Sequence, residues 1–271
     1  MTDDRPDYAA LEALAAELAH LAGAEIEASL GRTLRVAYKG EEGQTRDPVS
    51  EVDHAVETLI RARLGEIHPD HDIVGEEFPE RPNAGHPIIW AVDPVDGTAN
   101  FVNGLPLFAA SVGVLHDGAP VAGAVWCSNG HALRHGVYSA CLGGELRFDG
   151  TPLTPVSRPQ VRRALVGMPR TDGWEPRWFD ARKTGSAAIE CAFVAAGLLA
   201  GARFETPNLW DVAGGAALVR AAGGQLREHR DGAWRDLGSF GAEDGDDAGA
   251  WRAPMVLGTP DAVAALEGWT P

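Results

Sequence analysis

The chain has 271 residues, of which 45% are hydrophobic and 23% charged, and its formal net charge is −16. These values predict a globular protein with a large core, built as one big domain or as two closely packed halves. The acidic charge argues against nucleic acid and anionic membranes as partners, and no apolar run reaches the roughly 18 residues that a membrane span needs.

The three cysteines, Cys127, Cys141 and Cys191, are too few and too widely spaced for a disulfide framework or a zinc site. They indicate buried thiols in a reducing compartment. Residues 1–6 are polar and acidic, which is not the pattern of a signal peptide. We therefore expect a cytoplasmic protein.

Two segments near the start of the chain carry apolar residues at helical spacing. The first helix is predicted over residues 8–30, with Gly31 as its C-terminal stop. Ser50 opens the second helix, because Asp53 stands three positions further on, a pattern close to a capping box. Residues 39–46 between the helices are polar and contain glycine, which predicts a loop.

A short strand and a longer buried strand follow the second helix. Residues 73–74 form the short one, which ends in Gly75-Glu76-Glu77, and the apolar run over residues 87–92 forms the longer one. The longer strand stops at two carboxylates, Asp93 and Asp96. Carboxylates at the end of a buried strand are costly unless something neutralises them, and a divalent metal is the obvious candidate.

Gly97 and Thr98 come directly after these carboxylates. They would leave backbone N–H groups free at a turn, which is how proteins cradle phosphate. One loop, residues 93–100, therefore offers both halves of a metal-assisted phosphate site.

Strand patterns dominate the next segment. Residues 109–115 and 121–126 are separated by His116-Asp117-Gly118, which predicts a hairpin. Prolines and polar residues around 151–159 then mark a boundary. We expect an N-terminal α+β half, residues 1–155, that carries the candidate metal-binding loops, and a C-terminal α/β half, residues 156–271.

In the second half, strands alternate with helices, which predicts a layered α/β architecture. Ser186 can cap a helix that runs to about Leu199, and Asp211 begins another that ends at Gly223-Gly224. A strand over residues 254–257 and a helix over residues 261–269 complete the chain.

Acidic side chains recur at helix starts and strand ends. They are Asp47 and Asp53, Glu76 and Glu77, Asp93 and Asp96, and Asp211. Singly, each has a structural explanation: Asp53 can cap a helix, and Asp211 can interact with a helix dipole. Together they are hard oxygen ligands without His or Cys neighbours, a set that suits Mg²⁺ or Mn²⁺ rather than Zn²⁺. Two metal ions about 4 Å apart need a bridging carboxylate and several terminal ones, which this set could supply.

Four motifs in these segments resemble those of the inositol monophosphatase family, which belongs to a superfamily of lithium-sensitive, Mg²⁺-dependent phosphatases that includes fructose-1,6-bisphosphatases. In family order they are Asp47-Pro-Val-Ser50-Glu-Val-Asp53, Gly75-Glu76-Glu77, Trp90-Ala-Val-Asp93-Pro-Val-Asp96-Gly-Thr98-Ala-Asn100-Phe101 and Trp210-Asp211-Val-Ala-Gly-Gly. The resemblance covers nearly the whole chain. It implies one compact unit with the layered αβαβα sandwich of this superfamily, and a homodimer.

The resemblance also implies a set of metal ligands. One Mg²⁺ would be held by Glu76, Asp93 and the Val95 carbonyl, and a second by Asp93, Asp96 and Asp211. A third, weaker ion would lie near Glu76 and Glu77, and Mn²⁺ would be able to replace Mg²⁺.

Further roles carry over from the family motifs. Thr98 and Glu76 would position the attacking water, with Asp47 behind Thr98. Gly97 and Thr98 would offer backbone N–H groups to the phosphate. The segment Gly185-Ser186-Ala187-Ala188 and the side chain of Glu205 would lie near the substrate hydroxyls. The sequence departs from the family pattern at Ser50, which replaces a threonine, and in a loop from Glu205 to Asp211 that is about one residue shorter than in the animal enzymes.

The implied reaction is hydrolysis of a small phosphorylated substrate by in-line attack of a metal-activated water. Glu205 favours inositol 1-phosphate or a similar polyol phosphate. Histidinol phosphate, fructose 1,6-bisphosphate, NADP and 3′-phosphoadenosine nucleotides are alternatives; those with a second anionic group would need basic residues, for which Arg170, Arg182, Lys183 and Arg203 are candidates. A regulatory or scaffolding protein that retains the fold is an alternative of another class. The intact acidic set argues against pure scaffolding, and the charge of −16 argues against direct contact with RNA.

Overall fold

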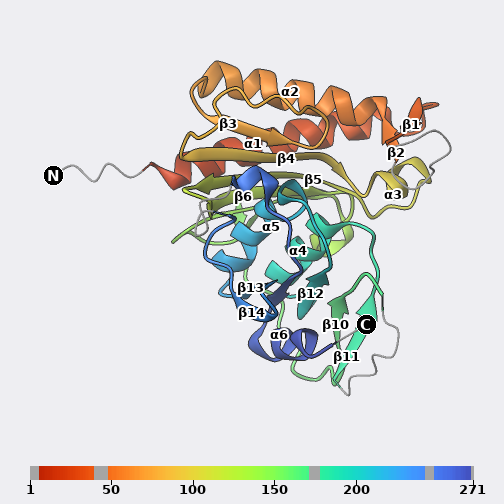
Figure 1. Ribbon diagram of the computed structural model, residues 1–271. Coiled ribbons are helices and arrows are strands. Elements are labelled where there is room, and N and C mark those ends of the chain that lie inside the picture. Colours follow the sequence, from red (N-terminus) through yellow and green to blue (C-terminus); the bar gives the residue numbers. More distant parts are fainter. Residues whose placement is uncertain (1–5, 40–47, 171–177, 242–246, 270–271) are drawn as a thin grey trace.

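The computed structural model describes residues 6–39, 48–170, 178–241 and 247–269. Within these ranges, two large sheets and the helices that cover them form five layers (Figure 1). Helices α1 and α2 cover one face of the first sheet, α4 and α5 fill the space between the sheets, and α6 covers the outer face of the second sheet. The predicted αβαβα sandwich is confirmed.

The outer helices of the first layer are α1 (Tyr8–Ser29) and α2 (Glu51–Ile67). Both begin where the sequence predicts. Ser50 caps α2, and its backbone N–H donates to Asp53, so the predicted capping box is confirmed. A small antiparallel pair, β1 (Val36–Tyr38) and β2 (Pro48–Ser50), precedes α2.

The first sheet has the strand order β3-β4-β5-β6-β7-β8-β9. Its strands are β3 (Asp72–Gly75), β4 (Ile88–Asp96), β5 (Ala109–His116), β6 (Ala119–Cys127), β7 (Gly136–Cys141), β8 (Arg147–Phe148) and β9 (Thr151–Pro152). Strands β5 and β6 form the predicted hairpin. Side chains alternate between the faces of β4: Trp90 and Val92 pack with α1 and α2, whereas Ile89 and Ala91 face the inner helices.

The expected loop over residues 93–100 is wrong. Strand β4 continues through Asp96, because Asp93 pairs with Ser111 and Asp96 pairs with Ala109 on β5. The register shifts between these two pairs, so both carboxylates lie at an irregularity inside the sheet. A short helix, α3 (Thr98–Val102), follows after Gly97.

The inner layer consists of α4 (Ala187–Ala195) and α5 (Leu209–Ala221). Ser186 caps α4 as predicted, but the helix ends four residues before Leu199, because Gly197 takes a φ of 73° and the Leu198 N–H donates back to the Phe193 carbonyl oxygen. Helix α5 begins at Leu209 rather than at Asp211, which therefore lies in its first turn.

The second sheet has the order β11-β10-β12-β15-β13-β14. Its strands are β10 (Ala164–Gly167), β11 (Phe179–Arg182), β12 (Gly201–Phe204), β13 (Gln225–Arg230), β14 (Ala233–Asp236) and β15 (Met255–Gly258). Strands β11, β10 and β12 are parallel, so their carboxyl ends meet at one edge of the sheet. Helix α6 (Pro260–Glu267) packs on the outer face. Two 3₁₀ turns, His131–Leu133 and Ala248–Ala250, complete the described elements.

The first sheet ends at Pro152 and the second begins at Ala164, and one buried apolar cluster contains side chains from both sheets. All three cysteines are buried and free. In the described part of the chain, no helix is long and apolar enough to cross a membrane.

Candidate active site

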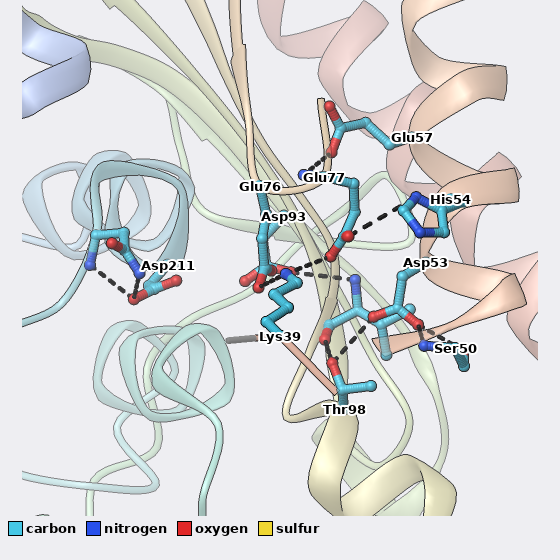
Figure 2. Close-up of polar contacts among 12 residues, drawn as sticks. Lys39, Ser50, Asp53, His54, Glu57, Glu76, Glu77, Asp93, Thr98 and Asp211 are labelled. Carbon is cyan, nitrogen blue, oxygen red and sulfur yellow. Dashed lines mark hydrogen bonds and ion pairs between the residues drawn. The ribbon is translucent and has the colours of Figure 1, made fainter. Parts of the chain in front are cut away.

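Four carboxylates interact electrostatically in the folded chain, and Figure 2 shows three of them, Glu76, Asp93 and Asp211. Glu76 directly follows β3, Asp93 and Asp96 lie on β4, and Asp211 lies on α5. Burial raises the pKa of Asp93 well above its ordinary value, and the negative charges of Glu76, Asp96 and Asp211 raise it further. Such mutual effects require short separations, so the fold has brought these sequence-predicted residues together.

The pKa values of the other two aspartates, Asp96 and Asp211, are also raised. Burial raises the pKa of Asp96 to about 7, against the opposing effect of hydrogen bonds from Ser186 and the Ala188 backbone. Burial and the charge of Asp96 raise the pKa of Asp211 to about 7, although it accepts a hydrogen bond from the Asn208 backbone at 2.7 Å. A cation placed among these groups would relieve the repulsion.

A lysine that sequence reasoning did not select partly supplies this positive charge. The Lys39 ammonium lies 2.7 Å from a carboxylate oxygen of Glu76 and 2.7 Å from one of Glu77 (Figure 2). Burial opposes its charge, but these hydrogen bonds raise the pKa of Lys39 above its ordinary value, so it remains protonated. Burial also raises the pKa of Glu77, while Lys39 opposes that rise.

Glu57, a second residue that the sequence did not indicate, fixes the backbone on this side of the site. Its buried carboxylate accepts hydrogen bonds from the Glu77 backbone at 2.7 Å and from the Arg61 side chain at 2.7 Å. The segment after β3, which carries Glu76, is therefore tied to helix α2.

Thr98 contacts Asp53, an aspartate that the sequence did not link to it. Its hydroxyl lies 3.0 Å from an oxygen of Asp53 and 2.8 Å from the Val95 carbonyl oxygen (Figure 2). Asp47, which the sequence placed behind Thr98, lies outside the described residues. Asp53 thus has two roles, since one oxygen completes the cap of α2 and the other accepts from Thr98.

Gly97 joins β4 to α3 in a conformation that favours glycine, with φ of 85°. A Cβ atom built onto it would lie 3.2 Å from the carbonyl oxygens of Gly185 and Leu107. The backbone at Gly97 and Thr98 therefore lies close to the turn that precedes α4.

The predicted substrate-side residues Ser186 and Ala187 are linked to the carboxylates. One oxygen of Asp96 accepts hydrogen bonds from the Ser186 hydroxyl and, at 2.7 Å, from the Ala188 backbone. Glu190 supports the same turn: it accepts from the Thr184 hydroxyl at 2.8 Å, and burial raises its pKa to about 7. The start of α4 is thereby attached to β4.

Glu205 follows β12, six positions before Asp211 in the chain. Its carboxylate pairs with Arg203 at 3.2 Å and keeps 32% of its side chain exposed. The structure gives no hydrogen bond between Glu205 and the other predicted site residues among those it describes.

The donor chemistry of the site suits a hard divalent cation. Glu76, Asp93, Asp96 and Asp211 offer only oxygen atoms, and the Val95 carbonyl lies between two of them in the chain. Within the described ranges, no three His, Cys, Asp or Glu side chains stand in a ready-made metal-holding group. The buried negative charge nevertheless fits such a cation, because burial and neighbouring carboxylates raise the pKa values of Asp93, Asp96 and Asp211.

Comparison with known proteins identifies the family. Residues 7–247 match the profile of the inositol monophosphatase family. The chain is 34% identical over 208 residues to the inositol-1-monophosphatase ImpA of Mycolicibacterium smegmatis, covering 70% of this chain and 73% of the relative. It is also 34% identical over 195 residues to the Nus factor SuhB of Xylella fastidiosa, covering 66% and 68%.

A solved structure, that of inositol monophosphatase from Anabaena, shares the fold with a TM-score of 0.72 at 21% identity, covering 97% of each chain. Such low identity shows the fold alone, whereas the family match spans most of the sequence. The chain therefore belongs to the inositol monophosphatase family and is a phosphoric monoester hydrolase.

Proposed function

We propose that this protein is a Mg²⁺-dependent phosphatase that hydrolyses a small polyol monophosphate, with inositol 1-phosphate as its preferred substrate. The observation that carries the proposal is the convergence of buried carboxylates whose pKa values are raised by burial and mutual repulsion. Perturbed acidic groups of this kind are typical of sites that bind metal or perform catalysis.

In this proposal, Glu76, Asp93 and the Val95 carbonyl hold one Mg²⁺, and Asp93, Asp96 and Asp211 hold the second. Bound divalent cations would act as Lewis acids, which lower the pKa of the attacking water and stabilise charge on the phosphoryl and leaving oxygens. Mn²⁺ has the same preference for oxygen and would be able to substitute. A third, weaker ion would compete with Lys39 for Glu76 and Glu77.

The chain's own groups orient the reactants. Thr98 and Glu76 position the water, and Asp53 fixes the Thr98 hydroxyl at 3.0 Å. Asp47 is assigned to a position behind Thr98, as the family motif implies. The backbone N–H groups of Gly97 and Thr98 bind phosphate oxygens, a role supported by the position of Gly97 against the turn before α4.

The leaving alcohol is assigned to the side of the site formed by Ser186, Ala187 and Glu205. The name of the Mycolicibacterium smegmatis relative supports inositol phosphate as the substrate. Asp96 holds the start of α4, so Ser186 and Ala187 keep a fixed position beside the carboxylates. The exposed carboxylate of Glu205 is suited to accept hydrogen bonds from hydroxyl groups.

A substrate panel tests this proposal. Phosphate release is measured with Mg²⁺ for inositol 1-phosphate, histidinol phosphate, fructose 1,6-bisphosphate, NADP and adenosine 3′,5′-bisphosphate. We expect the highest kcat/KM for inositol 1-phosphate. A higher value for a bisphosphate or a nucleotide would replace the polyol assignment, and the absence of release from every substrate would refute phosphatase function.

Three further properties belong to this proposal. The family resemblance supports a homodimer and inhibition by lithium, which size-exclusion chromatography with light scattering and an activity assay would test. The buried free cysteines support residence in the reducing cytoplasm.

A further inference from the structure

Arg203 is a buried cation next to the proposed substrate contact. It lies on β12, and only 6% of the residue is exposed. Its guanidinium lies between two aromatic rings, 5.3 Å from the centre of Trp234 and 4.8 Å from that of Trp269. Arginine is rarely buried without partners, so its hydrogen bonds show what the cation stabilises.

Those hydrogen bonds connect two distant parts of the chain. One terminal nitrogen donates to the carbonyl oxygens of Leu266 at 2.6 Å and Trp269 at 2.8 Å, at the end of α6. The last carbonyls of a helix lack intrahelical donors and attract cations, which explains this contact. The Nε atom donates in the other direction, to Glu205 at 3.2 Å.

The Arg203–Glu205 pair is fixed at one end and open at the other. The Arg203 side chain is 8% exposed, whereas that of Glu205 is 32% exposed. Among the described residues, Glu205 has a hydrogen bond to only one of its two oxygens, so the second can accept from a ligand. A carboxylate held in place before binding loses less conformational entropy when the substrate arrives.

We propose that Arg203 is a positioning residue for substrate recognition, which holds Glu205 in place to accept hydrogen bonds from the hydroxyls of the leaving polyol. This inference rests on the proposed function, in which Glu205 faces the substrate. The chain just after α6 also contacts this guanidinium, through the carbonyl oxygen and the ring of Trp269.

A double-mutant cycle tests the proposal. Arg203→Met, Glu205→Gln and the double variant are assayed with Mg²⁺ on inositol 1-phosphate and on p-nitrophenyl phosphate, whose leaving group has no polyol hydroxyls. We expect Arg203→Met to raise KM for inositol 1-phosphate about tenfold, the loss of one charge-assisted hydrogen bond, with little change in kcat. In the Glu205→Gln background the same substitution should leave KM unchanged, and KM for p-nitrophenyl phosphate should not change in any variant.

Arg227→Met is the matched control. Arg227 lies on β13, pairs with Glu267 of α6 at 2.9 Å and donates to the Trp234 carbonyl oxygen on β14, so the control loosens α6 and β14 while leaving both members of the Arg203–Glu205 pair in place. It should leave both KM values unchanged. Arg203→Lys serves if the methionine variant does not fold. Lysine keeps the charge but has a single nitrogen, so it cannot reach Glu205 and the carbonyl oxygens of Leu266 and Trp269 as two guanidinium nitrogens do; it should raise KM in the same selective way.

Two results would overturn the positioning role: an equal rise in KM in the presence and absence of Glu205, or equal effects on both substrates. The same selective rise in Arg227→Met would also contradict it, since the effect would then come from α6 and β14 alone. If the wild-type protein hydrolyses neither substrate, the proposed function itself is refuted and the positioning role falls with it.

Discussion

Asp93 illustrates how the site opposes stability at the scale of a single residue. The residue is 1% exposed. Burial makes the largest contribution to its raised pKa, and the charges of Glu76, Asp96 and Asp211 raise the pKa further. One of its oxygens accepts a hydrogen bond from the Val95 backbone at 3.1 Å. Without a cation, the ionised carboxylate is therefore poorly compensated, whereas a divalent ion would neutralise it.

The substitution Asp93→Asn should separate function from stability. We expect phosphate release to fall by about two orders of magnitude or more, because the proposed bridging charge is lost. In EDTA the variant should unfold at a higher temperature than the wild type, because the amide removes one charge and keeps an acceptor for Val95. Phosphate release and thermal unfolding measure the two effects. Near-wild-type turnover would show that Asp93 is not a bridging ligand.

The sequence predicted the carboxylates of the site but not all of their partners. In the sequence, each predicted ligand stands where an apolar run stops or a helix starts. Lys39 belongs to a polar segment whose path the sequence does not define, and its contact with Glu76 crosses 37 positions. Asp53 was assigned to the helix cap and to the acidic set, whereas its contact with Thr98 forms only in the folded chain.

At the scale of elements, close backbone contact sets the position of α5 and hence of Asp211. A Cβ atom built onto Gly123 of β6 would lie 2.5 Å from the carbonyl oxygen of Gly214, and one on Gly113 of β5 would lie 2.6 Å from the Gly214 nitrogen. Backbone atoms cannot move aside as a flexible side chain can. Helix α5 therefore lies against the first sheet at a distance that only glycine permits.

Gly123→Ala should push α5 away from the sheet. We expect a loss of about 1–3 kcal/mol in the free energy of unfolding, the usual cost of overpacking, and a higher Mg²⁺ concentration for half-maximal activity because Asp211 moves with the helix. Gly65→Ala on α2 is the control: its added Cβ meets nothing within 4 Å and should stabilise the protein slightly. Chemical denaturation and a Mg²⁺ titration measure the effects. If the variant loses stability but needs the same Mg²⁺ concentration, the position of α5 does not control the metal affinity of the site.

Elements with clear periodicity were predictable, and those without it were not. Helices α1 and α2 and the β5–β6 hairpin follow from apolar spacing, capping and turn residues. The β13–β14 hairpin was not predicted, because its strands are rich in charged residues that pair across the sheet edge. The end of α4 lies at Gly197, a local stop signal that the prediction of a helix to about Leu199 did not use.

At the scale of the whole molecule, the net charge of −16 and the buried acidic groups predict a stability that depends on pH. Asp96 and Asp211 have pKa values of about 7 in the folded protein, against an ordinary value of 3.8. A carboxylate whose pKa is higher in the folded state stabilises the fold only while protonated. Its contribution is complete below about pH 4 and is lost as the pH rises through about 7.

We therefore expect Mg²⁺ to stabilise the protein more at pH 8 than at pH 5.5, because protons compete with the cation for the same carboxylates. Thermal unfolding with Mg²⁺ and with EDTA at both pH values measures the difference. An Asp211→Asn variant should show a smaller difference between the two pH values. A stabilisation by Mg²⁺ that is the same at pH 5.5 and pH 8 would contradict the assignment of these groups as ligands.

The layered architecture assembles the site from segments that are far apart in the chain, from residue 39 to residue 211. Sequence motifs predicted the fold class and the acidic residues, but only the folded chain shows that β3, β4 and α5 carry those residues to one place. The proposed substrate side depends on the second sheet, because the turn before α4 follows β11 and Glu205 follows β12, two strands that are parallel to β10.

We propose that the converging carboxylates hold the divalent cations that phosphate release requires. The decisive measurement is phosphate release from inositol 1-phosphate while Mg²⁺ is added back to EDTA-treated protein. We expect no turnover in EDTA, recovery in wild type as Mg²⁺ is restored, and no recovery in Asp211→Asn at the same Mg²⁺ concentrations. Turnover that persists in EDTA, or an Asp211→Asn variant that recovers like the wild type, would contradict it.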